Sequence, residues 1–198
     1  MATMPATGGL LDRAIRTAKL ERAAYEEVEA DQGATVQAGI VVAVGAIASA
    51  IGLAAASTAG AVPGTIGPNG AGAGGGLVSS VIGESITALI AWAAYAQVAF
   101  WVGTTVLKSP ETHADWGQVA RTLGFASAPR TLLILGVVPA LFVPVSLVVA
   151  VWLLITTVVA VRAALDVGTG RAIAIAIASW FTLAIVSAVV GQLLGSFL

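Results

Sequence analysis

Long uncharged apolar runs are the feature that most limits what this chain can fold into. Residues 34–56 contain no charged side chain, and neither do residues 172–198. A helix crosses the roughly 30 Å hydrocarbon core of a bilayer in about 20 residues, so each run is long enough to span it. Only 10% of the 198 residues are charged, and the mean hydropathy is +0.98. Because a soluble fold of this size needs a charged surface, these runs predict an integral membrane protein.

The apolar runs and their breaks predict five membrane spans after an N-terminal segment, residues 1–33. We expect the spans at residues 34–56, 85–107, 126–142, 145–165 and 172–197. The Gly/Pro-rich stretch 59–76 reads as a loop. Pro139 and Pro144 interrupt the run 131–165, and each proline removes a helix hydrogen bond, which favours a hairpin of one short and one longer helix. The predicted fold class is an all-α polytopic transmembrane helix bundle.

The placement of basic residues tests the number of spans. With five spans, all nine basic residues fall on one side of the membrane and none on the other. If residues 131–165 crossed only once, Arg162 and Arg171 would move to the opposite side. The tendency of basic residues to stay in the cytoplasm therefore favours the hairpin, with a cytoplasmic N-terminus and an external C-terminus.

The N-terminal segment changes character along its length. Four apolar residues recur at helical spacing, namely Leu11, Ala14, Ile15 and Ala18. They predict an amphipathic helix on the inner leaflet. Acidic residues then follow Tyr25: Glu26, Glu27, Glu29 and Asp31. Two interpretations stay open, because residues 25–31 either form a solvated helix or dock a protein partner or the loop that carries Arg121 and Arg130.

Glu84 is the most informative single residue. A carboxylate inside the hydrocarbon is costly and by default marks a functional site. The run 77–107 is longer than a membrane needs, however, so Glu84 can also lie near the external end of its span and reach water. If Glu84 is buried, it shares a helix face with Ala88, Ala91 and Tyr95, which predicts a groove of small residues.

Small residues also recur in the last span, where Ser187, Gly191 and Gly195 are spaced four apart. This spacing places them on one helix face, and Gly191-x-x-x-Gly195 permits two helices to approach closely. The interpretations are packing within the bundle and self-association.

Several chemical functions find no support in the sequence. There is no cysteine, so no disulfide, thiolate nucleophile or sulfur metal site is available. Gly70, Gly72 and Gly75 match G-x-G-x-x-G but lack the strand and helix that a dinucleotide site needs. His113 is the single histidine and cannot form a ligand cluster. With a net charge of −1 there is no basic excess for nucleic acid. We expect no catalysis, cofactor, metal or nucleic-acid partner.

Two stretches together resemble the Yip1-domain membrane proteins in their bacterial form. The first is Tyr25–Asp31, followed shortly by Ala34–Thr35, and the second is Leu123–Arg130, which contains Gly124 and Pro129. The resemblance implies five helices, a cytoplasmic N-terminus and a bacterial cytoplasmic membrane. Eukaryotic members of the family are implied to act in vesicle traffic through small GTPases. This chain lacks their longer N-terminal region and its Asp-Leu-Tyr-Gly-Pro type motif, so that role is not carried over.

Two functions compete on these observations. The first is a non-enzymatic membrane scaffold or accessory subunit, which acts through helix packing and the cytoplasmic segments. Its partners are the lipid bilayer and a second copy or another membrane protein. The second is a small transporter, channel or lipid-moving protein that uses Glu84 and the proline-broken hairpin, because broken helices often line transport sites. Whether Glu84 lines a cavity or faces external water distinguishes them.

Overall fold

The structure, a computed structural model, describes residues 8–62, 76–108, 110, 112 and 114–196, and every regular element in these ranges is a helix. This confirms the predicted all-α bundle. In chain order the elements are α1 (Leu10–Ala18), α2 (Arg22–Ala30), α3 (Ala34–Thr58), α4 (Leu77–Trp101), the π-helical η1 (Val102–Val106), α5 (Trp116–Ala126), the 3-10 helix η2 (Ala128–Val137), α6 (Pro139–Leu165) and α7 (Thr169–Gly195).

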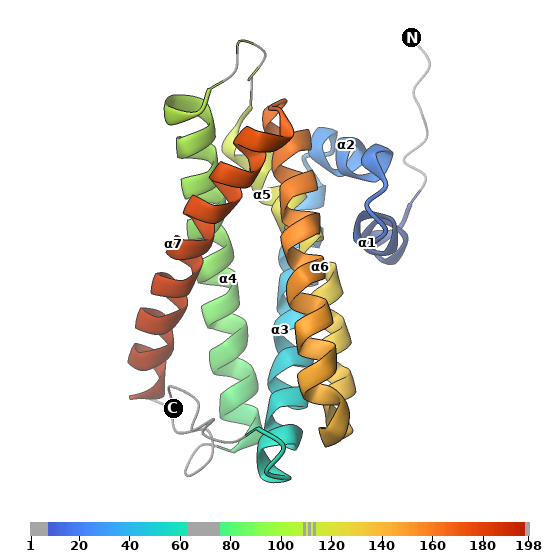
Figure 1. Cartoon of the computed structure of the whole chain (residues 1–198), viewed down its shortest axis with the longest axis vertical. Coiled ribbons are helices and arrows are strands. Elements are labelled where there is room, and N and C mark those ends of the chain that lie inside the picture. Colours follow the sequence, from blue (N-terminus) through green and yellow to red (C-terminus); the bar gives the residue numbers. More distant parts are fainter. Residues whose placement is uncertain (1–7, 63–75, 109, 111, 113, 197–198) are drawn as a thin grey trace.

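The long helices run side by side, and the two short N-terminal helices lie against one end of them (Figure 1). We call α1 and α2 the cap, and the end that carries them the cap end. The turn between α6 and α7 lies at the cap end, whereas α3 ends, α4 begins and α7 ends at the opposite end. The main buried cluster, which includes Tyr95, Ala99, Ala160, Leu165 and Ile175, fills the cap half of the bundle.

Four helices are long and apolar enough to cross a membrane: α3, α4 continued by η1, α6 and α7. Two of them begin at least six residues before the predicted spans. The second span begins at Leu77 rather than at residue 85, directly after the glycine run ends at Gly76. α6 begins at Pro139 rather than at residue 145, because a proline is tolerated at the first helical position, where its missing N–H has no partner to lose. Pro144 lies inside α6 and does not end it.

The short side of the proline hairpin is not a single helix. The predicted span at residues 126–142 is divided between α5, which ends at Ala126, and η2, and the chain turns at Val138 in an extended conformation. We call α5 with η2 the arm. An α-helix rises about 1.5 Å and a 3-10 helix about 2.0 Å per residue, so 11 and 10 residues extend about 37 Å together. That length matches a bilayer core although neither piece does alone.

The arm lies directly along α3 because small residues remove the side chains between them. Three of these occur at seven-residue intervals on α3, namely Ala38, Gly45 and Gly52. A Cβ atom on Gly124 would lie 2.6 Å from the Cβ of Ala38, and one on Gly45 would lie 3.2 Å from the Cβ of Arg130. A Cβ on Gly52 would collide with the backbone oxygen of Leu133. The arm therefore descends parallel to α3, away from the cap.

Candidate intramembrane site

A cavity of about 570 Å³ opens between the long helices and the arm. One wall is a single face of α4, formed by Glu84, Ala88, Ala91 and Tyr95. Residues four, seven and eleven positions apart share a helix face, which is the groove that the sequence suggests for a buried Glu84. Most of the other lining side chains are apolar, including Val42, Leu123, Leu153 and Leu183.

A second wall comes from the small residues of α7. Ser187 and Gly191 line the cavity together with Ala184 and Ala188, and Gly191 is buried. Gly195 is exposed, one turn further along α7. The small-residue face of α7 therefore borders an open space over much of its length. The cavity continues across the bundle to α6, where Leu153 and Thr157 line it.

Glu84 is paired inside this cavity. The guanidinium of Arg130 donates a hydrogen bond through Nη2 to Oε1 of Glu84. Glu84 lies seven residues into α4, which is about 10 Å from the start of the helix. The side chain of Glu84 remains 35% exposed and that of Arg130 29% exposed, because both face the cavity. Within the described residues this is the single hydrogen bond of the Arg130 guanidinium, so four of its five donors stay available.

The position of Arg130 corrects the charge count made from the sequence. That count places all nine basic residues outside the membrane, whereas Arg130 lies in the body of the bundle beside Gly45 of α3. The arm begins at the cap end and has already descended by a full α-helix when it reaches Arg130. The sequence could have indicated this position, because Arg130 lies inside the predicted span 126–142. A charged residue inside a span usually faces a partner within the membrane.

Gly124 and Pro129 place the arm rather than contact the cavity. Gly124 permits close approach to α3, and Pro129 is buried at the second position of η2, in a turn where its missing N–H matters least. In a 3-10 helix every third residue shares a face. One face of η2 therefore carries Arg130, Leu133 and Gly136, and it lies against Gly45 and Gly52 of α3. The guanidinium then extends past α3 to reach Glu84.

Tyr95 adds a phenol hydroxyl to the polar groups that line the cavity. Its side chain is 6% exposed, and its hydroxyl has no hydrogen-bond partner among the described residues. The hydroxyl faces Thr157 and Trp180 without forming a hydrogen bond of ordinary geometry with either. Tyr95, Thr157 and Trp180 therefore form a polar patch in the cavity wall, in addition to Glu84 and Arg130.

The cavity is closed on the side of the cap. Trp92 lies at its wall and donates a hydrogen bond through Nε1 to the backbone oxygen of Ala120, at 3.0 Å, which joins α4 to α5. The main buried cluster continues from there to the cap end. The exposed lining residues Ala184 and Ala188 place an opening of the cavity beside α7.

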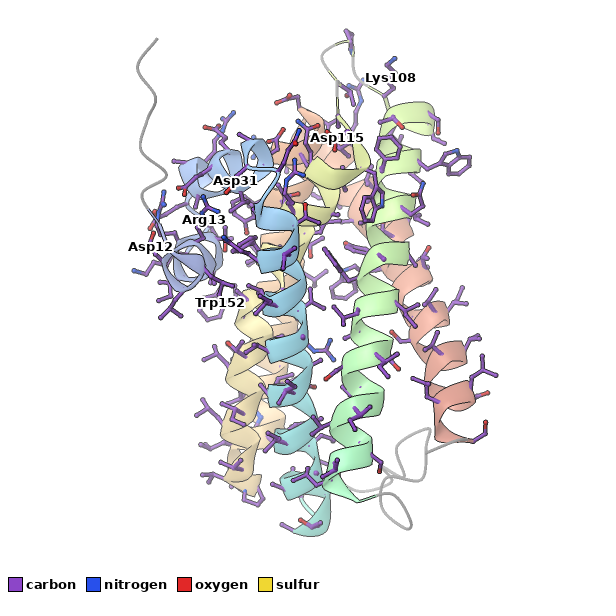
Figure 2. The ribbon with its side chains drawn as sticks, turned by 180° about the vertical axis from the view of Figure 1, so that it is seen from behind. Asp12, Arg13, Asp31, Lys108, Asp115 and Trp152 are labelled. Carbon is purple, nitrogen blue, oxygen red and sulfur yellow. The ribbon has the colours of Figure 1, made fainter. Side chains whose placement is uncertain are left out.

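The cap is fastened to the bundle by its own polar residues. Arg13 is 2% exposed and donates hydrogen bonds to Glu27, Asp31 and Gln37, at 2.9, 2.7 and 3.2 Å. Figure 2 shows Arg13 and Asp31 facing each other there, at the same end of the bundle as Lys108 and Asp115. Arg13 and Thr17 are thus the buried residues of α1, whereas Leu11 and Asp12 are exposed.

The acidic segment of the cap docks on the bundle through its backbone. Arg121 of α5 donates hydrogen bonds to the backbone oxygens of Val28 and Glu29, at 3.2 and 2.7 Å. Tyr25 is fully buried, and its hydroxyl donates to the backbone oxygen of Thr17 at 2.9 Å. Of the acidic residues singled out in the sequence, Glu26 is the exposed one. Residues 25–31 therefore contact the chain's own Arg121, whereas Arg130 lies far from them in the cavity.

Three carboxyl groups of the cap have pKa values that are shifted in opposite directions. Burial alone would raise the pKa of Glu27, but hydrogen bonds from Arg16 and Arg13 lower it overall. The hydrogen bond from Arg13 lowers the pKa of Asp31. Burial raises the pKa of Glu29 to about 7, and the nearby charge of Asp166 adds to this shift. The cap therefore contains carboxyl groups whose pKa values are shifted to either side of the ordinary value for a carboxyl.

Comparison with known proteins now adds the family. The Yip1 domain matches residues 20–191, which include α2, the arm and nearly all of α7. The chain belongs to the Yip1-domain family. No curated protein and no solved structure matches it. The Yip1 domain contains the whole cavity, whereas α1 and Arg13 precede it. The motif Gly70–Gly75 and His113 lie outside the described residues.

Proposed function

We propose that this multi-pass Yip1-domain protein binds an amphiphilic membrane molecule in its cavity and acts by non-covalent binding. The observation that carries the proposal is that Glu84 and Arg130 face the same apolar-walled cavity. A space with apolar walls and one charged region complements a lipid-like molecule. Its volume lies in the range of about 300–1,000 Å³ that is usual for ligand pockets.

An ion pair at this depth is a poor device for stability alone. Removing two charges from water is expensive, and replacing such a pair by apolar residues is often neutral or stabilising. Glu84 and Arg130 also leave hydrogen-bonding groups unused toward the cavity. Both facts support a role in binding, and they favour the lipid-moving hypothesis over a carboxylate that simply faces external water.

The distribution of charge supports an orientation for the proposal. Eight of the nine basic residues lie toward the cap end, and Arg130 is the ninth. Basic residues favour the cytoplasmic side, so we place the cap in the cytoplasm of a bacterial cell. The arm then crosses the membrane as the third of five spans, and the cavity lies near the middle of the bilayer, because its lining residues occupy the central turns of α4, α6 and α7.

A scaffold or accessory role is the second candidate. Large apolar side chains at four-residue intervals form an exposed stripe on α7, namely Ile173, Ile177, Phe181, Ile185, Val189 and Leu193. Such a stripe is suited to contact with lipid tails, and equally to contact with a span of a second copy or of another membrane protein. The acidic residues of the cap favour this role less, because Glu27 and the backbone of Glu29 are already bonded within the chain.

Filling the cavity tests the proposal. Ala188 lines the cavity and is exposed, so Ala188→Trp occupies the space without overpacking a closed core. Ala174→Trp is the matched control, because Ala174 is exposed on the same helix and does not line the cavity. We expect lipid retained after purification in detergent to fall for Ala188→Trp and to stay at the wild-type amount for Ala174→Trp, as measured by mass spectrometry. Equal retention in both variants would contradict the proposal.

A further inference from the structure

We infer that the ligand of the cavity is a phospholipid with a zwitterionic headgroup, whose ammonium binds Glu84 while its phosphate binds Arg130. This inference rests on the proposed function and adds the chemical class of the ligand. It depends on the charge balance of the site, on the groups that the ion pair leaves unused, and on the shape of the surrounding wall.

The charge balance selects the headgroup. Among the described residues that line the cavity, Glu84 and Arg130 are the two charged ones, so the site is neutral as a whole. An anionic headgroup would satisfy Arg130 but leave the carboxylate of Glu84 beside a second negative charge. A cationic amphiphile would satisfy Glu84 but leave the guanidinium of Arg130 beside a second positive charge. Because uncompensated charge is heavily penalised away from water, a ligand with both charges fits best.

The ion pair can accept such a headgroup without breaking. Arg130 uses one of its five N–H donors on Glu84, and the remaining donors suit a phosphate, which guanidinium groups bind in a planar, two-pronged manner. Glu84 uses Oε1 for Arg130, and its other carboxylate oxygen can accept hydrogen bonds from an ammonium group. Headgroup and pair then form a closed set of four alternating charges.

The rest of the wall accommodates the acyl part. Leu153 of α6 and Leu183 of α7 line the cavity with Leu123 of the arm, and none of these side chains carries a polar atom. The small residues Ala184 and Ala188 are exposed at its edge. A chain that begins at the ion pair therefore passes between α6 and α7 toward the lipid phase. We therefore expect the site to select lipids by their headgroup and to accept acyl chains of different kinds.

Competition between two lipids tests this specificity. The full-length protein is placed in nanodiscs that contain equal amounts of phosphatidylethanolamine and phosphatidylglycerol with identical acyl chains. The lipid that stays bound after transfer to detergent is identified by mass spectrometry. We expect the wild type to retain phosphatidylethanolamine about tenfold over phosphatidylglycerol, the ratio that corresponds to one well-placed charge interaction. Equal retention of both lipids by the wild type would overturn the inference.

Charge variants show whether Glu84 and Arg130 cause the preference. Glu84→Gln leaves Arg130 alone, so its preference should reverse toward phosphatidylglycerol. The double variant with Glu84→Gln and Arg130→Gln avoids an unpaired charge, and it should fold and bind either lipid without preference. An unchanged preference in the double variant would contradict the assignment even if the single variant fails to fold. Loss of lipid from Ala188→Trp with no headgroup preference in the wild type would reject this inference and leave the proposed function standing.

Discussion

Arg13 and Arg130 show how differently one residue type is used in this chain. Arg13 is 2% exposed, and three side-chain acceptors surround it. Arg130 has one acceptor and faces an open cavity. An arginine whose partners all belong to the fold holds the fold together, whereas one with unused donors beside a cavity is available to a ligand. The sequence presents both only as basic residues.

The first prediction concerns Arg13. Arg13→Ala leaves Asp31 without its guanidinium partner and leaves Glu27 paired with Arg16 alone, so we expect the free energy of unfolding to fall by roughly 1–3 kcal/mol, the usual value for charged hydrogen bonds. Arg22→Ala is the control, because the Arg22 side chain is 78% exposed and its pair with Glu26 lies within one helix. We expect a change within about 0.5 kcal/mol there. Equal thermal midpoints for the two variants in detergent would show that the cap does not depend on Arg13.

The second prediction concerns pH and Glu29. Its pKa is about 7 in the folded protein and 4.5 in the unfolded reference. The folded state therefore holds this proton more tightly, and its contribution to stability is complete below a pH of about 4.5 and is lost as the pH rises to about 7. Glu29→Gln should remove this part of the pH dependence. Thermal midpoints of the two proteins across that interval give the test, and parallel curves would refute it.

At the scale of elements, the arm marks the limit of what the sequence predicts. The hairpin follows from Pro139, and the uncharged helices follow from length and hydropathy. The 3-10 geometry of η2 does not follow, because it depends on how closely α3 lies alongside. The face of α4 from Glu84 to Tyr95 is predictable from helical periodicity. Its partner Arg130 is 46 residues away, and only the packed arm brings the two together.

The third prediction tests the contact between the arm and α3. Gly52→Ala and Gly124→Ala place a methyl group against a backbone oxygen and against Ala38, so each should lower stability by about 1–3 kcal/mol. Gly39→Ala on α3 is the control, since its Cβ would lie 3.7 Å from the ring of Trp92, an ordinary contact. Thermal unfolding in detergent measures all three. If Gly39→Ala were as unstable as Gly52→Ala, any added methyl group on α3 would lower stability, and the contact with the arm would not be the cause.

At the scale of the whole molecule, the course of the chain places the cap and the end of α7 far apart. The cap and the end of α7 lie at opposite ends of the bundle (Figure 1). The four long helices alone would return the chain to the end at which it started, so this separation depends on the arm as a fifth pass along the bundle. The length of the arm and its course along α3 make this crossing possible.

The fourth prediction is therefore topological. The chain has no cysteine, so a single new one can be labelled alone. Lys19→Cys in the cap and Ser196→Cys after α7 are both exposed positions. We expect a membrane-impermeant thiol reagent added to intact cells to label Ser196→Cys and to label Lys19→Cys only after the membrane is opened. Labelling of both cysteines from the same side would show that the arm does not cross.

The most direct test of the central claim is to find where a bound lipid lies. A phospholipid with a photoactivatable group in its acyl chain is mixed with the full-length protein in nanodiscs, and the modified residues are mapped by mass spectrometry after illumination. We predict strong modification of the cavity-lining residues Leu153 and Ser187, and its loss in Ala188→Trp while Ala174→Trp keeps it. Modification confined to the outward residues of α7, such as Ile185 and Val189, and equal in both variants, would contradict the account.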